Sequence, residues 1–139
     1  MILLEYKNKI EELNRLNGDL QVFCAQYSVD AKIRYSLLLC LDEIFTNIVS
    51  YAFKDKQEHS IHLTLDYVDS AISIQIEDDG APFDPIRSIP RPKLSKNIDD
   101  IPIGGLGIFL VEQLMDGLAY TRLNDKNVLC MRKRVVEFI

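Results

Sequence analysis

The chain is short of the features that mark membrane-spanning, secreted and nucleic-acid-binding proteins. Its 139 residues include three cysteines, two histidines and no tryptophan, and the net charge is −5. No stretch approaches the roughly 18 continuous apolar residues of a membrane span, and the first residues lack the basic and apolar pattern of a signal peptide. Nucleic-acid binding needs a basic face, so the acidic balance argues against it. We therefore expect neither membrane nor nucleic-acid partners.

The number and surroundings of the cysteines predict a reducing compartment. Cys24, Cys40 and Cys130 are odd in number and lie among apolar residues. This pattern is typical of buried thiols rather than of disulfides or a metal cluster. We therefore expect a cytoplasmic location.

The remaining composition predicts one folded domain over residues 1–139. Apolar residues make up 47% of the chain and charged residues 27%, the profile of a globular protein with one core. Hydrophobic periodicity predicts three helices, at about 9–27, 30–53 and 105–116. Alternating apolar residues predict strands at 60–68, 72–76, 118–122 and 128–134, with a possible edge strand at 2–6.

Capping and turn residues set the expected ends of these elements. Asn8 and Glu11 have the spacing of a capping box for the first helix, and Asp30 is a candidate cap for the second. Gly117 is placed to end the third helix. The polar run 124–127 predicts a turn between the last two strands.

The second predicted helix carries a polar face with a carboxylate and an amide one turn apart. Glu43 and Asn47 lie four residues apart, opposite the apolar arc of the helix. Any amphipathic helix has a polar face, whether or not that face has a function. The pair alone is therefore also compatible with an ordinary solvated surface. The pair also suits metal chemistry, since Mg²⁺ takes oxygen ligands and a carboxylate can accept a proton from an attacking hydroxyl.

An aspartate follows the strand at 72–76, on its buried side. Continuing the alternation places Asp78 on the same face as Ile72, Ile74 and Ile76. A buried carboxylate needs a donor, and an adenine amino group would supply one, with Gly80 letting a flat base approach the backbone. The alternative ends the strand at residue 77 and leaves both aspartates in a solvated Asp-Gly turn.

A glycine-rich segment opens the third predicted helix. The run Gly104-Gly105-Leu106-Gly107 offers free backbone N–H groups and the positive end of the helix dipole, which together favour an anion. Before it lies the long segment 86–103, which has no clear period. A loop of this length is either a surface insertion or a lid, and its place between the two glycine motifs favours a lid.

Taken in order, these motifs resemble the GHKL, or Bergerat-fold, ATPase superfamily. The resembling stretches are residues 41–53, 78–85 and 104–111, and the likeness spans about residues 9–135. The chain is most similar to the small single-domain branch, the bacterial anti-sigma-factor serine/threonine kinases. This resemblance implies an α+β two-layer sandwich, with a mixed, mostly antiparallel sheet covered on one face by about three helices.

The resemblance also implies ATP and Mg²⁺ as cofactors and a role for each candidate residue. Asn47 matches the Mg²⁺ ligand and Glu43 the general base. Asp78 matches the acid that binds the adenine amino group, and Gly80 the glycine beneath the base.

Gly105 and Gly107 match the glycines at the phosphates, and residues 86–103 match the ATP lid. Two departures from the pattern stand out. Some kinases of this branch place an arginine just before the glycine motif, where this chain has Pro102-Ile103. Many relatives have histidine where this chain has Tyr51.

By resemblance, the chain is expected to phosphorylate a STAS-type anti-anti-sigma protein and to bind a sigma factor, commonly as a homodimer. The first helix and strand are candidates for the dimer interface. Two alternatives stay open: a nucleotide-binding anti-sigma module with little kinase activity, and a scaffold that binds no nucleotide.

Overall fold

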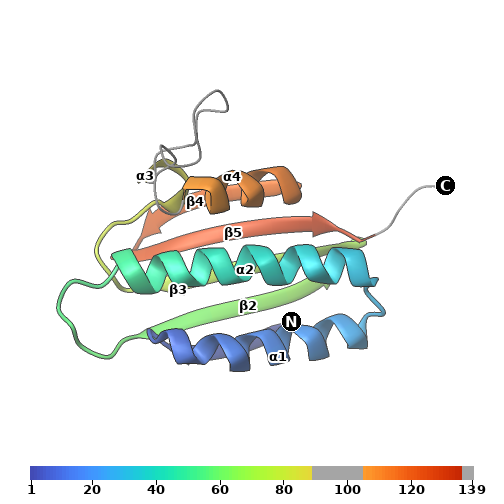
Figure 1. Ribbon diagram of the computed structural model, residues 1–139, viewed down its shortest axis with the longest axis horizontal. Helices are drawn as coiled ribbons and strands as arrows, with labels where there is room; N and C mark the ends of the chain where they lie inside the picture. Colours follow the sequence, from blue (N-terminus) through green and yellow to red (C-terminus); the bar gives the residue numbers. More distant parts are fainter. Residues whose placement is uncertain (89–104, 136–139) are drawn as a thin grey trace.

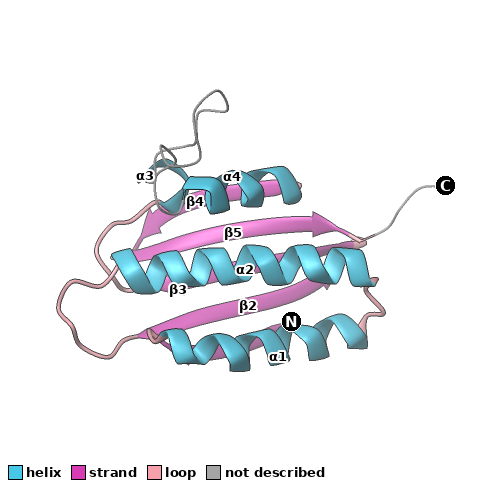
Figure 2. Cartoon of the chain, viewed as in Figure 1, coloured by secondary structure: helices cyan, strands magenta, loops and turns pink. Residues whose placement is uncertain are grey.

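The computed structural model describes residues 1–88 and 105–135, and their secondary structure forms two layers (Figure 1, Figure 2). Within these residues the sheet has five strands in the order β1-β2-β3-β5-β4. The strands are β1 Ile2–Lys7, β2 Ser60–Val68, β3 Ala71–Asp78, β4 Gly117–Leu123 and β5 Lys126–Arg134. The predicted α+β sandwich is confirmed. The expectation of a mixed sheet is wrong for the described strands, because each neighbouring pair is antiparallel.

Three helices of ten or more residues cover one face of the sheet (Figure 1). The helical segments are η1 Ile10–Glu12, α1 Leu13–Gln26, α2 Ala31–Tyr51, α3 Pro85–Ser88 and α4 Gly105–Leu114. The Asp30 cap is confirmed, because its Oδ1 accepts a hydrogen bond from Ile33 N at 2.9 Å. Gly117 does not end α4 as expected: it is the first residue of β4.

The capping box predicted at Asn8 is wrong. Lys9 takes the N-cap position of η1, without a side-chain cap. The strand β1 runs to Lys7, so the Asn8 side chain meets the loop before β2. Its Nδ2 donates to Gln57 O at 3.2 Å, and its Oδ1 accepts from His59 N at 2.8 Å. Asn8 therefore ties the end of β1 to the loop that follows α2.

Two tight hairpin turns set the register of the sheet. Asp69 and Ser70 have φ of 53° and 60°, and Asn124 and Asp125 have 53° and 61°. Two-residue turns with both φ values positive match the right-handed twist of antiparallel strands. The turn predicted at 124–127 is therefore shorter than expected. Its last two residues belong to β5, which places Asn127 opposite Asp78 on β3.

The core lies between the sheet and the helices, and the other face of the sheet is open. The apolar stripe of α2 is buried as predicted, and it packs with the inward residues of β2 and β3. Cys24 and Cys40 are buried as expected, but Cys130 is exposed, because the two-residue period of β5 points it to the open face. No helix in the described ranges is both long and apolar enough to cross a membrane.

One histidine joins three segments beside the end of β3. The His59 ring stacks on Phe53, with centroids 4.7 Å apart. Its Nδ1 lies 3.1 Å from Asp79 Oδ1, and its Nε2 lies 2.8 Å from Asp55 Oδ2. The hydrogen bond with Asp55 is the main cause that raises the His59 pKa, with the charges of Asp55 and Asp79 adding to it. Both ring nitrogens face carboxylates, so this contact requires the imidazolium.

We expect this contact to stabilise the fold most at low pH. A raised folded-state pKa means that the stabilisation is complete below the unfolded pKa of about 6.5 and is lost as the pH rises through the folded value. His59→Gln should therefore lower the Tm more at about pH 6 than at about pH 9. His62→Gln is the control, because His62 faces a single carboxylate, Glu5, at 3.6 Å. An equal Tm loss for His59→Gln at both pH values would contradict this assignment.

Candidate functional site

The segment after β3 lies directly against the end of α2. A Cβ placed on Gly80 would sit 2.6 Å from Ala52 O, closer than any side chain tolerates. Ala81 N donates to the same carbonyl at 2.8 Å. Glycine at position 80 is therefore required for this approach, and Asp78 and the end of α2 become neighbours.

Asp78 lies on the buried face of β3, as the alternation predicted, and the alternative of a solvated turn is wrong. The residue is 2% exposed. Its Oδ1 accepts hydrogen bonds from Gly80 N and Asn127 Nδ2, both at 2.9 Å. Burial raises the pKa of the carboxyl, while these two donors act in the opposite direction. Among the described residues no donor reaches Oδ2, so the second oxygen is free to accept from a ligand.

Asn127 is a site residue that the sequence analysis missed. It is 4% exposed and binds Asp78 directly. The polar run around it suggested a turn, but the two-residue turn puts it in β5 with its side chain inward. A two-residue hairpin turn at Asn124 and Asp125 would have predicted that Asn127 belongs to the last strand.

At Asn47 the polar face of α2 is buried and not solvated. Asn47 is 4% exposed, and its Nδ2 has no hydrogen-bond partner among the described residues. A buried unsatisfied amide costs about 1–3 kcal/mol. The fold therefore leaves an amide donor unpaired at this point, and the amide oxygen is the atom that could ligate a cation.

Glu43 lies under the first turn of α4. A Cβ on Gly107 would overlap the Glu43 carboxyl group, so the two residues are in direct contact. Burial, and then the negative charge of Asp42, raise the pKa of Glu43. Gly105 is the first residue of α4, so the start of this helix, where backbone N–H groups are free, lies beside the carboxylate.

Along α2, the candidate residues follow one order. Ala52, which touches Gly80, is nine residues from Glu43, or about 14 Å along the helix axis. Asn47 lies between them. This span is comparable with the length of an extended nucleoside triphosphate. The three sequence clusters therefore lie in order along the length of α2, with the base-binding candidates at one end and the phosphate-binding candidates at the other.

The described residues hold no preformed metal cluster, since no group of three or more His, Cys, Asp or Glu side chains comes together. The residues fit a Mg²⁺ ion that arrives with phosphates, because one amide oxygen, from Asn47, together with phosphate oxygens and water, makes a normal shell. The lid predicted at 86–103 lies outside the described residues except for 86–88, in α3.

The contact between Gly107 and Glu43 has a direct test. We expect Gly107→Ala to destabilise the fold by about 1–3 kcal/mol, because the new methyl group must displace either α4 or the carboxylate. Gly18→Ala is the matched control in α1, where a Cβ meets nothing within 4 Å, and it should stabilise by up to about 1 kcal/mol. Urea unfolding midpoints measure both. Equal stability of the two variants would show that α4 does not lie on Glu43.

Comparison with known proteins agrees with this geometry. The histidine kinase-like ATPase domain family matches residues 6–133. The chain is 39% identical over 101 residues to serine/threonine-protein kinase BtrW of Bordetella bronchiseptica, covering 73% of this chain and 70% of BtrW. It is 37% identical over 93 residues to serine-protein kinase RsbW of Staphylococcus aureus, covering 63% and 54%. The chain thus spans about half the length of the RsbW relatives that it matches.

Solved structures show the same fold. The blue-light activated histidine kinase of Erythrobacter litoralis EL346 aligns with a TM-score of 0.58 at 19% identity, covering 77% of this chain and 32% of that one. Its isolated histidine kinase domain aligns with a TM-score of 0.55 at 17% identity, covering 91% and 60%. The resemblance seen in the motifs is confirmed: the chain belongs to the family of histidine kinase-like ATPase domains, alongside relatives named as serine kinases.

Proposed function

We propose that this chain is an ATP- and Mg²⁺-dependent protein serine/threonine kinase that acts as an anti-sigma factor in the cytoplasm. Its substrate would be a serine or threonine of a STAS-type anti-anti-sigma protein, and its second partner a sigma factor. The observation that carries the proposal is the order of the Asp78-Gly80 segment, Asn47 and Glu43 along the length of α2. The names of the BtrW and RsbW relatives support it.

The base-binding end suits adenine. The free Oδ2 of Asp78 would accept a hydrogen bond from the 6-amino group. Gly80 has no side chain to block a flat ring, and a bulkier residue there would already collide with Ala52. A buried carboxylate left partly unpaired favours a ligand with a matching donor over one without it.

The other end suits phosphates and phosphoryl transfer. The start of α4 offers N–H groups to an anion, and Asn47 would hold Mg²⁺, which offsets negative charge on the phosphates when bound. Glu43 would take the proton from the incoming hydroxyl while the oxygen forms its bond to the γ-phosphorus. The bond from that phosphorus to the bridging oxygen breaks, and ADP leaves. Burial moves the pKa of Glu43 upward, toward the range where a general base works best.

Glu43 and Asp78 should separate binding from transfer. We expect Glu43→Gln to bind ATP normally but to lose transfer by about 100-fold or more, because only the base is removed. Asp78→Asn should lose ATP binding, because the amide presents a donor where the ligand also has one. Calorimetry with ATP and Mg²⁺ measures binding. Transfer of radiolabelled γ-phosphate to a STAS protein captured by pull-down measures activity.

The outcomes also separate the competing functions. ATP binding by the unaltered chain without transfer to the captured protein would favour a nucleotide-gated anti-sigma module. Absence of any ATP binding would favour a scaffold. Normal ATP binding by Asp78→Asn would show that Asp78 does not contact the base.

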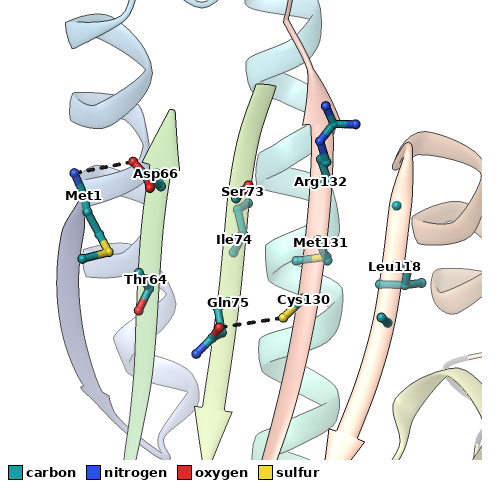
Figure 3. Close-up of a pocket in the computed structure, with 12 residues that line it drawn as sticks. Met1, Thr64, Asp66, Ser73, Ile74, Gln75, Leu118, Cys130, Met131 and Arg132 are labelled. Atoms are coloured by element: carbon teal, nitrogen blue, oxygen red, sulfur yellow. Dashed lines mark hydrogen bonds and ion pairs between the residues drawn. The ribbon is translucent and has the colours of Figure 1, made fainter. Parts of the chain in front are cut away.

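A homodimer is part of the proposal, and the open face of the sheet is its candidate interface. A hollow of about 480 Å³ lies on this face, across β2, β3, β5 and β4, with Met1 at its edge (Figure 3). In the strand register, Asp66 on β2, Ser73 on β3 and Arg132 on β5 form one row. Arg132 makes no ion pair with the described residues. A two-fold axis along β3 would place Asp66 of each copy over Arg132 of the other.

The predicted pairing can be tested by charge reversal. We expect Asp66→Arg and Arg132→Asp each to weaken dimerisation, because each puts like charges opposite one another. The double variant should restore it. Sedimentation velocity at two or more protein concentrations measures the dimer fraction. If both single variants dimerise like the original chain, the interface lies elsewhere, with α1 and β1 as the next candidates.

A further inference from the structure

We propose that Asn127 sets the purine specificity of this site: its amide holds Oδ1 of Asp78, leaves Oδ2 for the 6-amino group of adenine, and so rejects 6-oxopurine nucleoside triphosphates. This inference rests on the proposed function, because it assumes that a purine binds at Asp78. In it, Asn127 is a positioning residue that acts on the ligand through Asp78.

The orientation of the Asn127 amide is fixed by the donors around its oxygen. Oδ1 accepts from Phe83 N at 3.0 Å, from the Tyr120 hydroxyl at 2.5 Å and from Arg122 Nη1 at 3.2 Å. If the amide were flipped, its NH₂ group would face Phe83 N and Arg122 Nη1, which can only donate. The segment after β3, through Phe83, and the strand β4, through Arg122, therefore select the same orientation.

The Nδ2 group of Asn127 then has two acceptors. It donates to Asp78 Oδ1 at 2.9 Å and to Ala81 O at 2.8 Å. Both of its hydrogens are used, and Gly80 N adds a second donor to the same oxygen of Asp78 at 2.9 Å. Asp78 Oδ1 thus accepts two hydrogen bonds, and Oδ2 is the oxygen that the ligand would contact.

The charge on Asp78 decides which purine is accepted. Burial favours the protonated carboxyl, and the donors from Asn127 and Gly80 favour the carboxylate. As a carboxylate, Asp78 accepts from a 6-amino group and repels a 6-oxo group. Without Asn127 one of the two donors is lost, so protonation becomes easier. A protonated Asp78 can donate to a 6-oxo group, and the discrimination falls.

A purely structural role for Asn127 would have a different signature. If the amide only tied β5 to the segment after β3, its loss would loosen the site for every nucleotide alike. The ratio of the affinities for ATP and ITP, which has a 6-oxo group in place of the amino group, separates the two roles. The pH dependence of ATP binding also separates the two roles. A purely structural loss of affinity would not change with the protonation state of Asp78.

The experiment measures ATP and ITP binding by calorimetry for the full chain and for Asn127→Ala, between about pH 6 and pH 8.5. The unaltered chain should prefer ATP by roughly 100-fold or more, as expected of a site built to read a polar group. In Asn127→Ala the preference should fall by at least about tenfold, and ATP affinity should decrease as the pH is lowered. Equal losses for ATP and ITP, without pH dependence, would overturn the inference.

Two further variants keep the test decisive. Tyr120→Phe removes one donor to Asn127 Oδ1 but leaves the bond to Asp78, so its ATP preference should stay within about threefold of the unaltered chain. If Asn127→Ala does not fold, Asn127→Leu replaces it, because leucine has a similar size and no donor. An ATP preference in Asn127→Leu within about threefold of the original would then overturn the inference.

The binding data also distinguish a failure of the proposed kinase function from a failure of the specificity inference. If the unaltered chain binds neither ATP nor ITP, the proposed kinase function is wrong. If it binds both equally, Asp78 does not read the 6-position and the specificity inference falls while nucleotide binding stands. If it prefers ATP and Asn127→Ala keeps that preference, only the role of Asn127 is wrong.

Discussion

A buried carboxylate needs donors, and this requirement at Asp78 organises one end of the molecule. The donors come from Gly80, two residues along the chain, and from Asn127, on the neighbouring strand. The Asn127 amide in turn needs partners, and it finds them in the segment after β3 and on β4. A single polar network therefore joins β3, β4, β5 and the segment that leads toward α3. Because each bond depends on the next, the network fixes geometry as well as stability.

The helix α2 sets the spacing of the site, because it belongs to both the core and the polar side. Its apolar stripe packs on the sheet, which fixes its rotation about its own axis. That rotation carries Glu43 under α4 and brings the carbonyl of Ala52 to the strand end. A change in core packing would therefore move both ends of the site together. The distance between them would not change, because it is set by the length of α2 that joins them.

The sequence predicted features with a local cause and missed those that depend on pairing. Alternation placed Asp78 on the buried face, and Asp30 was a cap with its partner three residues away. Asn8 was misread because its partners lie about fifty residues away, in the loop before β2. Asn127 was missed for the same kind of reason, since its burial follows from the register between β3 and β5. Glycine spacing indicated an anion site, but the contact of Gly107 with Glu43 requires the packing of two helices.

The unsatisfied amide of Asn47 bears on whether the polar side of α2 is functional or incidental. An apolar residue of similar size would avoid the loss of about 1–3 kcal/mol that a buried, unpaired group brings. Glu43 is a second unfavourable polar group on α2, because burial raises its pKa and so disfavours its charged form in the folded state. Two destabilising polar groups one turn apart on α2, of which Glu43 lies against the start of α4, are typical of sites where stability is given up for binding.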